Sequence, residues 1–132
     1  MRKKKKNFEE IINMQRKKTG KLFSFCFFAT GQIAGKSYKE NMRLNKIGED
    51  IGLLFQLADD FLDIKSSKKL TGKSVKKDSK KGKSTLLNLM GEKKAYLYAF
   101  NLKKKILLKL KKHGKKAKNL TNTIEFILGR NF

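Results

Sequence analysis

The chain has 132 residues and no proline or tryptophan, and a chain of this length is expected to form one domain. Its single cysteine excludes an intrachain disulfide and a cysteine-based metal cluster. Lys and Arg number 34 against 11 Asp and Glu, which gives a net charge of +23. Such a charge favours nucleic acid or an anionic membrane as a partner. Because the lysines are spread along the whole chain, we interpret them instead as a compositional bias over an ordinary fold.

The first part of the chain predicts a disordered start and two helices. Residues 1–6 are basic, and no apolar run of signal-peptide type follows them, so we expect a cytoplasmic protein. Residues 8–18 predict a short helix that leads into Lys18-Thr19. Residues 22–33 are apolar on nearly all sides, which predicts a buried helix, with Cys26 as a packed thiol. This helix is too short to span a bilayer.

A long helix with an acidic patch is predicted next. Ser37 and Glu40 form a capping-box pattern, and the helix that they start is expected to run to about Lys65. Its predicted core positions are Ile47, Leu54, Leu57, Ala58, Phe61 and Leu62. On the remaining face Asp59 and Asp63 are separated by one turn, so their like charges repel. A divalent cation such as Mg²⁺ would reverse that repulsion, whereas the alternative is a solvated acidic face.

Residues 66–83 predict a lysine-rich loop with two Gly-Lys pairs, Gly72-Lys73 and Gly82-Lys83. The pattern Gly82-Lys83-Ser84-Thr85 is not a nucleotide-binding P-loop, because Lys77 stands where that motif needs glycine.

The remainder of the chain predicts more helices and no strands. A helix broken at Gly91 and stopped by Gly114 carries apolar residues at spacings of three and four. His113 is the only histidine, and its place near that helix end favours a capping role over catalysis. A capping-box-like pair, Asn122 and Glu125, predicts the start of the last helix. The expected fold class is all-α.

Several ordered motifs together resemble one family. The segments FQLADDFLD, TGKSVKKD and GKST resemble the second aspartate-rich region of trans-prenyl diphosphate synthases, the farnesyl and geranylgeranyl diphosphate synthases. Lys18-Thr19-Gly20 and the terminal IEFILGRNF are similar to further elements of that family, so the resemblance covers residues 7–132. One departure is Lys76, where many bacterial members carry glycine. The first aspartate-rich motif, its paired arginine and the N-terminal basic site have no counterpart here, so the chain resembles the C-terminal part of the isoprenoid-synthase helical bundle.

The resemblance implies a prenyltransferase that condenses an allylic diphosphate with isopentenyl diphosphate and releases pyrophosphate, with Mg²⁺ as cofactor. It implies that the acidic cluster holds the metal and that three lysines bind diphosphate. Thr19 and Gln56 would line the reacting carbon, and Lys18 and Lys73 would also be catalytic. The implied metal ligands are Asp59, Asp60 and Asp63, and the implied diphosphate ligands are Lys18, Lys73 and Lys83.

The implied partners are a second copy or a complementing N-terminal half, with no specific nucleic acid and no membrane span. With one acidic motif, the chain alone is expected to be inactive and to expose apolar residues 22–29. Two alternatives remain: a non-catalytic partner subunit and a basic nucleic-acid-binding protein.

Overall fold

The computed structural model describes residues 7–71 and 85–129, and for residues 67–71 it describes the backbone only. These parts are helical and contain no strand, which confirms the all-α prediction. In chain order the elements are α1 (Phe8–Gln15), the π-helical turn η1 (Arg16–Gly20), α2 (Lys21–Ile33), α3 (Tyr38–Thr71), α4 (Leu86–Met90), α5 (Glu92–Lys111), the 3₁₀ turn η2 (Gly114–Ala117) and α6 (Lys118–Gly129).

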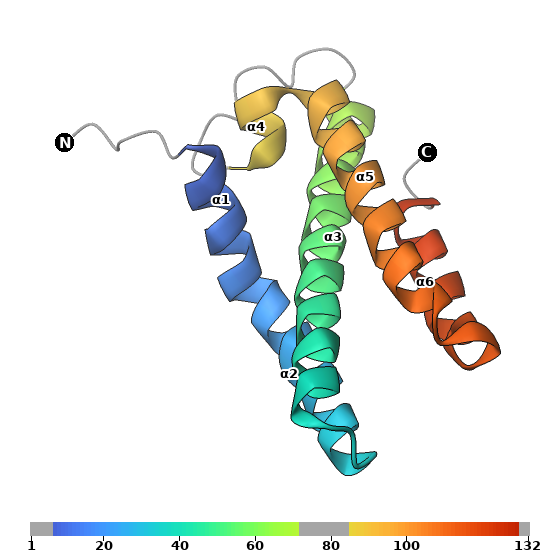
Figure 1. Ribbon diagram of the computed structural model, residues 1–132. Helices are drawn as coiled ribbons and strands as arrows, with labels where there is room; N and C mark the ends of the chain where they lie inside the picture. Colours follow the sequence, from blue (N-terminus) through green and yellow to red (C-terminus); the bar gives the residue numbers. More distant parts are fainter. Residues whose placement is uncertain (1–6, 72–84, 130–132) are drawn as a thin grey trace.

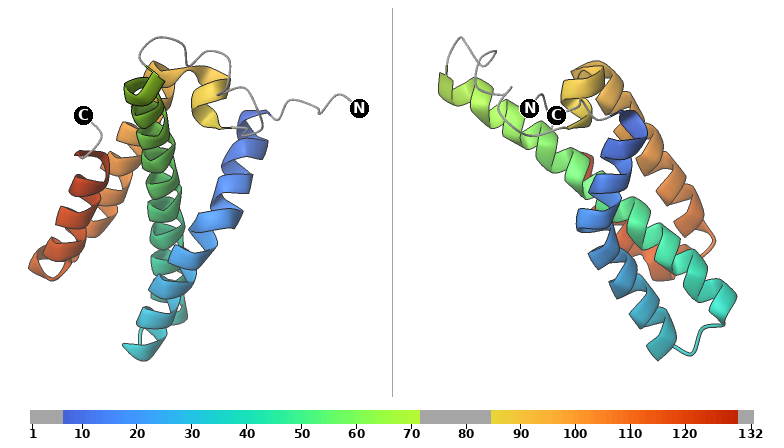
Figure 2. Two further views of the ribbon diagram at one scale, coloured as in Figure 1. Left: turned by 180° about the vertical axis from the view of Figure 1, so that it is seen from behind. Right: turned by 90° about the vertical axis from the view of Figure 1, so that its left-hand side faces the viewer.

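The long helix α3 is the axis of the molecule (Figure 1). The elements α1, η1 and α2 follow one another without a break and lie along one side of α3, whereas α5 and α6 lie along the other side (Figures 1 and 2). The short helix α4 contacts both α1 and α5. The predicted aspartate-rich and Lys-Thr segments therefore belong to two adjacent helical elements.

Local side-chain chemistry explains where the helices begin. The side chain of Asn7 accepts from the Glu10 amide at 2.9 Å, and the Glu10 carboxylate accepts from the Asn7 amide at 2.8 Å. The predicted capping box of Ser37 and Glu40 is confirmed, with reciprocal bonds of 3.2 and 3.3 Å. Three turns of the described residues use glycine at positive φ: Gly35 (+65°) between α2 and α3, Gly91 (+83°) between α4 and α5, and Gly114 (+55°) after α5.

Three predicted boundaries are wrong. The first helix does not end near Lys18, because the π-helical turn carries it into α2. The loop predicted from residue 66 begins later, since α3 continues to Thr71; the rest of that loop lies outside the described residues, as do residues 1–6. The last helix starts at Lys118, so Asn122 lies inside it rather than at its cap.

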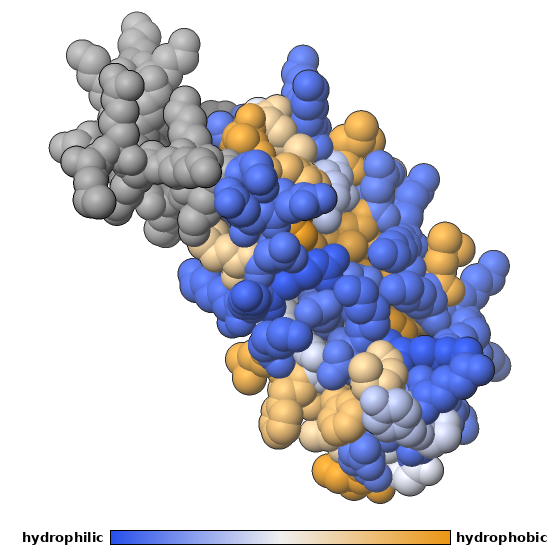
Figure 3. Space-filling view, turned by 60° about the vertical axis from the view of Figure 1, so that its left-hand side comes forward, coloured by the Kyte–Doolittle hydropathy of each residue, from blue (hydrophilic) through white to orange (hydrophobic). Residues whose placement is uncertain are grey.

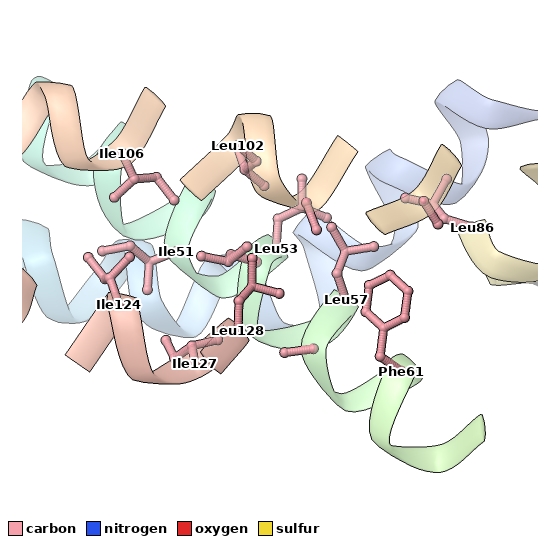
Figure 4. Close-up of a cluster of buried hydrophobic side chains, with 14 of the residues drawn as sticks. Ile51, Leu53, Leu57, Phe61, Leu86, Leu102, Ile106, Ile124, Ile127 and Leu128 are labelled. Carbon is pink, nitrogen blue, oxygen red and sulfur yellow. The ribbon is translucent and has the colours of Figure 1, made fainter. Parts of the chain in front are cut away.

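The core forms where α3 faces α1, α4, α5 and α6 (Figure 4). Each of the apolar residues of α5 that recur at helical spacing is buried: Ala95, Ala99, Leu102, Ile106 and Leu110. The predicted core positions of α3 are likewise buried, except Leu62, which is only half-buried. Burying a leucine or isoleucine contributes about 1.5–3 kcal/mol, so this interface dominates the stability of the chain.

Most of α2 is exposed, as expected of residues 22–29 in the chain alone, although the apolar pattern of residues 22–33 taken by itself predicted a buried helix. Only Ser24 and Gly31 of this helix are buried, while Leu22, Phe25 and Ile33 are 64%, 66% and 88% exposed. Cys26 is exposed as well, contrary to its expected role as a packed thiol. Figure 3 shows apolar surface among hydrophilic side chains on this side of the molecule. An apolar composition thus identified the helix correctly but not the face that α3 covers.

No helix among the described residues is both long and apolar enough to cross a membrane.

Candidate active site

The Lys-Thr segment lies in the five-residue π-helical turn η1, which is pressed against α3. A Cβ atom on Gly52 of α3 would lie 2.7 Å from the Cα atom of Gly20 and 3.0 Å from the carbonyl oxygen of Thr19. Only glycine at position 52 therefore lets the two backbones approach this closely. Single π-helical turns within α-helices are frequent at functional sites.

This close approach brings Thr19 to Gln56. The Thr19 hydroxyl donates to Gln56 Oε1 at 3.1 Å. Gln56 Nε2 in turn donates to Asp60 Oδ1 at 3.3 Å, and Gln15 Nε2 donates to Asp60 Oδ2 at 2.9 Å. Two residues that the resemblance placed at the reacting carbon are thus joined directly, although 37 positions separate them in the sequence.

The three aspartates of the acidic motif occupy different environments. Asp60 is buried and accepts from two side-chain amides, whereas Asp59 is half-buried and Asp63 is exposed. Within residues 7–71 and 85–129 no group of three His, Cys, Asp or Glu side chains is arranged to enclose a metal ion. Asp59 and Asp63 still supply the hard oxygen donors that Mg²⁺ takes, and this ion usually completes its shell with waters and phosphate oxygens rather than with protein alone. The donor set therefore fits magnesium bound together with a diphosphate.

Of the three predicted lysine ligands, the structure describes only Lys18. Lys18 is exposed and borders an open hollow of about 640 Å³ whose other lining residues are Glu10, Asn13, Met14 and Lys17. That hollow does not include Gln56 or the aspartates. Lys73 and Lys83 lie outside the described residues.

A buried ion-pair network, which the sequence analysis missed, holds the start of η1. The side chain of Asp50 on α3 is fully buried and contacts Arg16 at 2.9 Å, Lys109 at 3.1 Å and Lys105 at 3.8 Å. Burial raises the pKa of Asp50, but hydrogen bonds from Lys109 and Arg16 outweigh it and hold the pKa below its ordinary value. The network therefore fixes a position two residues before Lys18.

Glu49, the neighbour of Asp50, extends the network at the surface. It contacts Arg16 and Lys21 at 3.3 Å each and Lys46 at 2.9 Å. Burial raises its pKa, and the nearby lysines lower it by more, so the carboxylate is ionised at neutral pH. Arg16 is thus shared by two adjacent carboxylates of α3.

Gln15 was missed as well. It is 3% exposed and lies on the same side of α1 as the buried Ile11 and Ile12. The sequence carried a signal for both Gln15 and Asp50. Each is a polar or charged residue at a position that the helical apolar pattern predicts to be buried, and a buried polar side chain needs a hydrogen-bond or ionic partner.

The family model, the curated relatives and the solved structure that match this chain are all described as prenyl synthases. A family model described as polyprenyl synthetase matches residues 1–127. The farnesyl diphosphate synthase of Micrococcus luteus is 35% identical over 82 residues, which cover 62% of this chain and 28% of the relative. The geranylgeranyl diphosphate synthase of Cyanophora paradoxa is 35% identical over 118 residues, covering 86% of this chain and 38% of the relative.

Among solved structures, the apo FPP/GFPP synthase of Zymomonas mobilis superposes with a TM-score of 0.74 at 30% identity. The match covers 92% of this chain and 39% of that one. The chain thus spans about a third of the length of the curated relatives it matches.

Proposed function

Because the chain belongs to the polyprenyl synthetase family, we propose that it forms one side of a prenyltransferase active site. The reaction joins an allylic diphosphate to isopentenyl diphosphate and releases pyrophosphate. The observation that carries the proposal is the hydrogen bond between Thr19 of η1 and Gln56 of α3. It unites two motifs distant in sequence, beside a helix face with aspartates one turn apart.

One set of side chains acts on the diphosphate leaving group, and another acts on the allylic carbon. Lys18, Lys73 and Lys83 bind diphosphate oxygens, since each ammonium is a compact donor suited to phosphate. Asp59 and Asp63 would hold Mg²⁺, which when bound would neutralise charge on the departing pyrophosphate.

The allylic carbon develops positive charge as its C–O bond breaks and the electron pair leaves with pyrophosphate. The oxygens of Thr19 and Gln56 present the negative ends of their dipoles to that carbon. The double bond of isopentenyl diphosphate then forms the new C–C bond, and a proton is released. These side chains are held in place before substrate binds, which is the condition for effective electrostatic stabilisation.

The site also requires protein beyond these residues. Only one aspartate-rich motif occurs in the 132 residues. The exposed apolar side chains of α2, Leu22, Phe25 and Ile33, support packing against a second copy or a complementing N-terminal part.

Co-expression tests the proposal. We expect the 132-residue chain alone to aggregate and to lack condensation activity. Together with the N-terminal part of the Micrococcus luteus farnesyl diphosphate synthase it should become soluble and turn over, because the missing wall supplies ligands and excludes water. In that complex Asp59→Ala should abolish turnover, whereas Glu125→Ala, an exposed carboxylate of α6, should retain it.

Two outcomes would contradict the proposal. Robust condensation by the chain alone would show that the active site needs no complementing N-terminal part. A soluble complex in which Asp59→Ala leaves turnover intact would favour a non-catalytic subunit.

A further inference from the structure

The hydrogen bonds at the site begin at Gln15, the last residue of α1. Gln15 is 3% exposed and Asp60 is 8% exposed, and their bond of 2.9 Å joins side chains 45 positions apart. A hydrogen bond between side chains that are shielded from water is stronger than one at the surface. The end of α1 is therefore tied to the acidic motif by a side chain outside every motif of the family resemblance.

Asp60 in turn determines how the amide of Gln56 is oriented. Both oxygens of the Asp60 carboxyl group accept hydrogen bonds from side-chain amides, which requires the amide rotamer that points Gln56 Nε2 toward Asp60. The opposite rotamer would place Gln56 Oε1 against Asp60 Oδ1. With Nε2 bound to Asp60 at 3.3 Å, Oε1 faces Thr19, whose hydroxyl donates to it.

Packing alone does not account for a glutamine at position 15. Its Oε1 atom is buried and has no hydrogen-bond partner within the described part of the chain. Methionine would fill a similar volume beside Ile11 and Ile12 without leaving a buried acceptor unpaired. The contribution of the amide is thus its donation to Asp60.

We propose that Gln15 is a positioning residue of the active site, acting through Asp60 to fix the Gln56 and Thr19 oxygens toward the reacting carbon. The proposal rests on the proposed function. It gives Asp60 a role different from the metal ligation that the resemblance implied: Asp60 is the junction of the two glutamines, and Asp59 and Asp63 remain the residues for Mg²⁺.

Kinetics of the co-expressed complex tests the role. Gln15→Met should lower kcat by about tenfold, the effect of losing one hydrogen bond to a charged group, with KM little changed. Asn101→Leu, which removes an exposed side-chain amide of α5, is the control and should leave both unchanged. In a Gln56→Met background, Gln15→Met should lower kcat no further while still lowering the melting temperature, because its catalytic effect passes through Gln56.

The side-chain amides test the hydrogen bonds independently of turnover. The chain has three glutamines, so labelling their side-chain nitrogens gives three amide pairs. We expect slow proton exchange for Gln15 and Gln56 and fast exchange for Gln32. Gln15→Met should also accelerate exchange at Gln56.

The outcomes separate this inference from the proposed function. If the unaltered complex lacks turnover but the amides are protected as expected, the proposed function fails and the hydrogen-bond chain stands. If turnover occurs, the inference is overturned by additive kcat effects of Gln15→Met and Gln56→Met, or by exchange at Gln15 and Gln56 as fast as at Gln32.

Discussion

Asp50→Asn tests the buried network that anchors η1. The substitution keeps the shape of the side chain but removes its charge and places an amide donor toward cations. Arg16 and Lys109 then lose the carboxylate that they contact at 2.9 and 3.1 Å. We expect a large loss of stability, because the Asp50 side chain is fully buried and no water can replace its charge.

The magnitude follows from the exposure of the partners. Removing one member of a buried ion pair costs about 3–5 kcal/mol. Here Arg16 and Lys109 keep 18% and 33% of their side-chain surface exposed, so water partly compensates them, and Lys105 at 57% exposure adds little. We therefore expect about 2–4 kcal/mol. For 132 residues the entropy of unfolding is roughly 0.28 kcal/mol/K, so the melting temperature should fall by about 10 °C.

Urea unfolding at neutral and acid pH supplies the assay, with the protein diluted until the transition no longer depends on its concentration, because the chain alone is expected to aggregate. Folding lowers the pKa of Asp50. Its contribution to the free energy of unfolding is therefore present above the pKa of the unfolded state, about 3.9, and is lost as the pH falls through the pKa of the folded state. The difference between Asp50→Asn and the unaltered chain should thus be full at neutral pH and shrink below about pH 4. Glu125→Gln, which removes a half-exposed ion pair with Lys103, should cost less than about 1 kcal/mol. A loss equal to that of the control, or one that persists unchanged in acid, would refute the reasoning.

Three further predictions concern ligands and packing. Mg²⁺ with pyrophosphate should raise the melting temperature more than Mg²⁺ alone, and Asp59→Asn or Asp63→Asn should remove that rise; an equal rise in both variants would contradict the metal assignment. Nucleic acid should bind weakly and lose most of its affinity by physiological salt, so tight sequence-selective binding there, measured by fluorescence anisotropy, would restore the nucleic-acid alternative. Gly52→Ala should destabilise the chain by about 1–3 kcal/mol in a thermal melt, since its Cβ atom would meet Gly20, whereas Gly129→Ala meets nothing within 4 Å and should be nearly neutral.

The sequence predicted best what depends on a few neighbouring residues. Ser37 and Glu40 are three apart, so their reciprocal bonds could be predicted from type and spacing alone. The break at Gly91 is of the same kind, because a positive φ there is a property of one residue. The family resemblance implied that Thr19 and Gln56 both line the reacting carbon, but neither it nor local chemistry predicted the hydrogen bond between them.

What the sequence did not predict depends on which surfaces meet. The π-helical turn at η1 leaves no pattern of its own, and the close approach of Gly20 to Gly52 joins residues on two different helical elements. Which face of α2 stays exposed depends on which face α3 covers, and an apolar composition on all sides cannot indicate that face. Asp50 was overlooked because its partners Arg16 and Lys109 lie 34 and 59 positions away.

These tertiary contacts converge on the segment that carries Lys18 and Thr19. Arg16 binds the buried Asp50 just before this segment, Gly20 meets the backbone of α3 just after it, and Thr19 itself bonds to Gln56. A turn held at both ends and in its middle has little freedom to rearrange. The protein has therefore already lost the conformational entropy of placing the Thr19 oxygen, and a substrate that binds there need not supply it. Because a dipole stabilises a transient positive charge only if it does not have to reorient, this rigidity is itself part of the catalytic chemistry expected of the site.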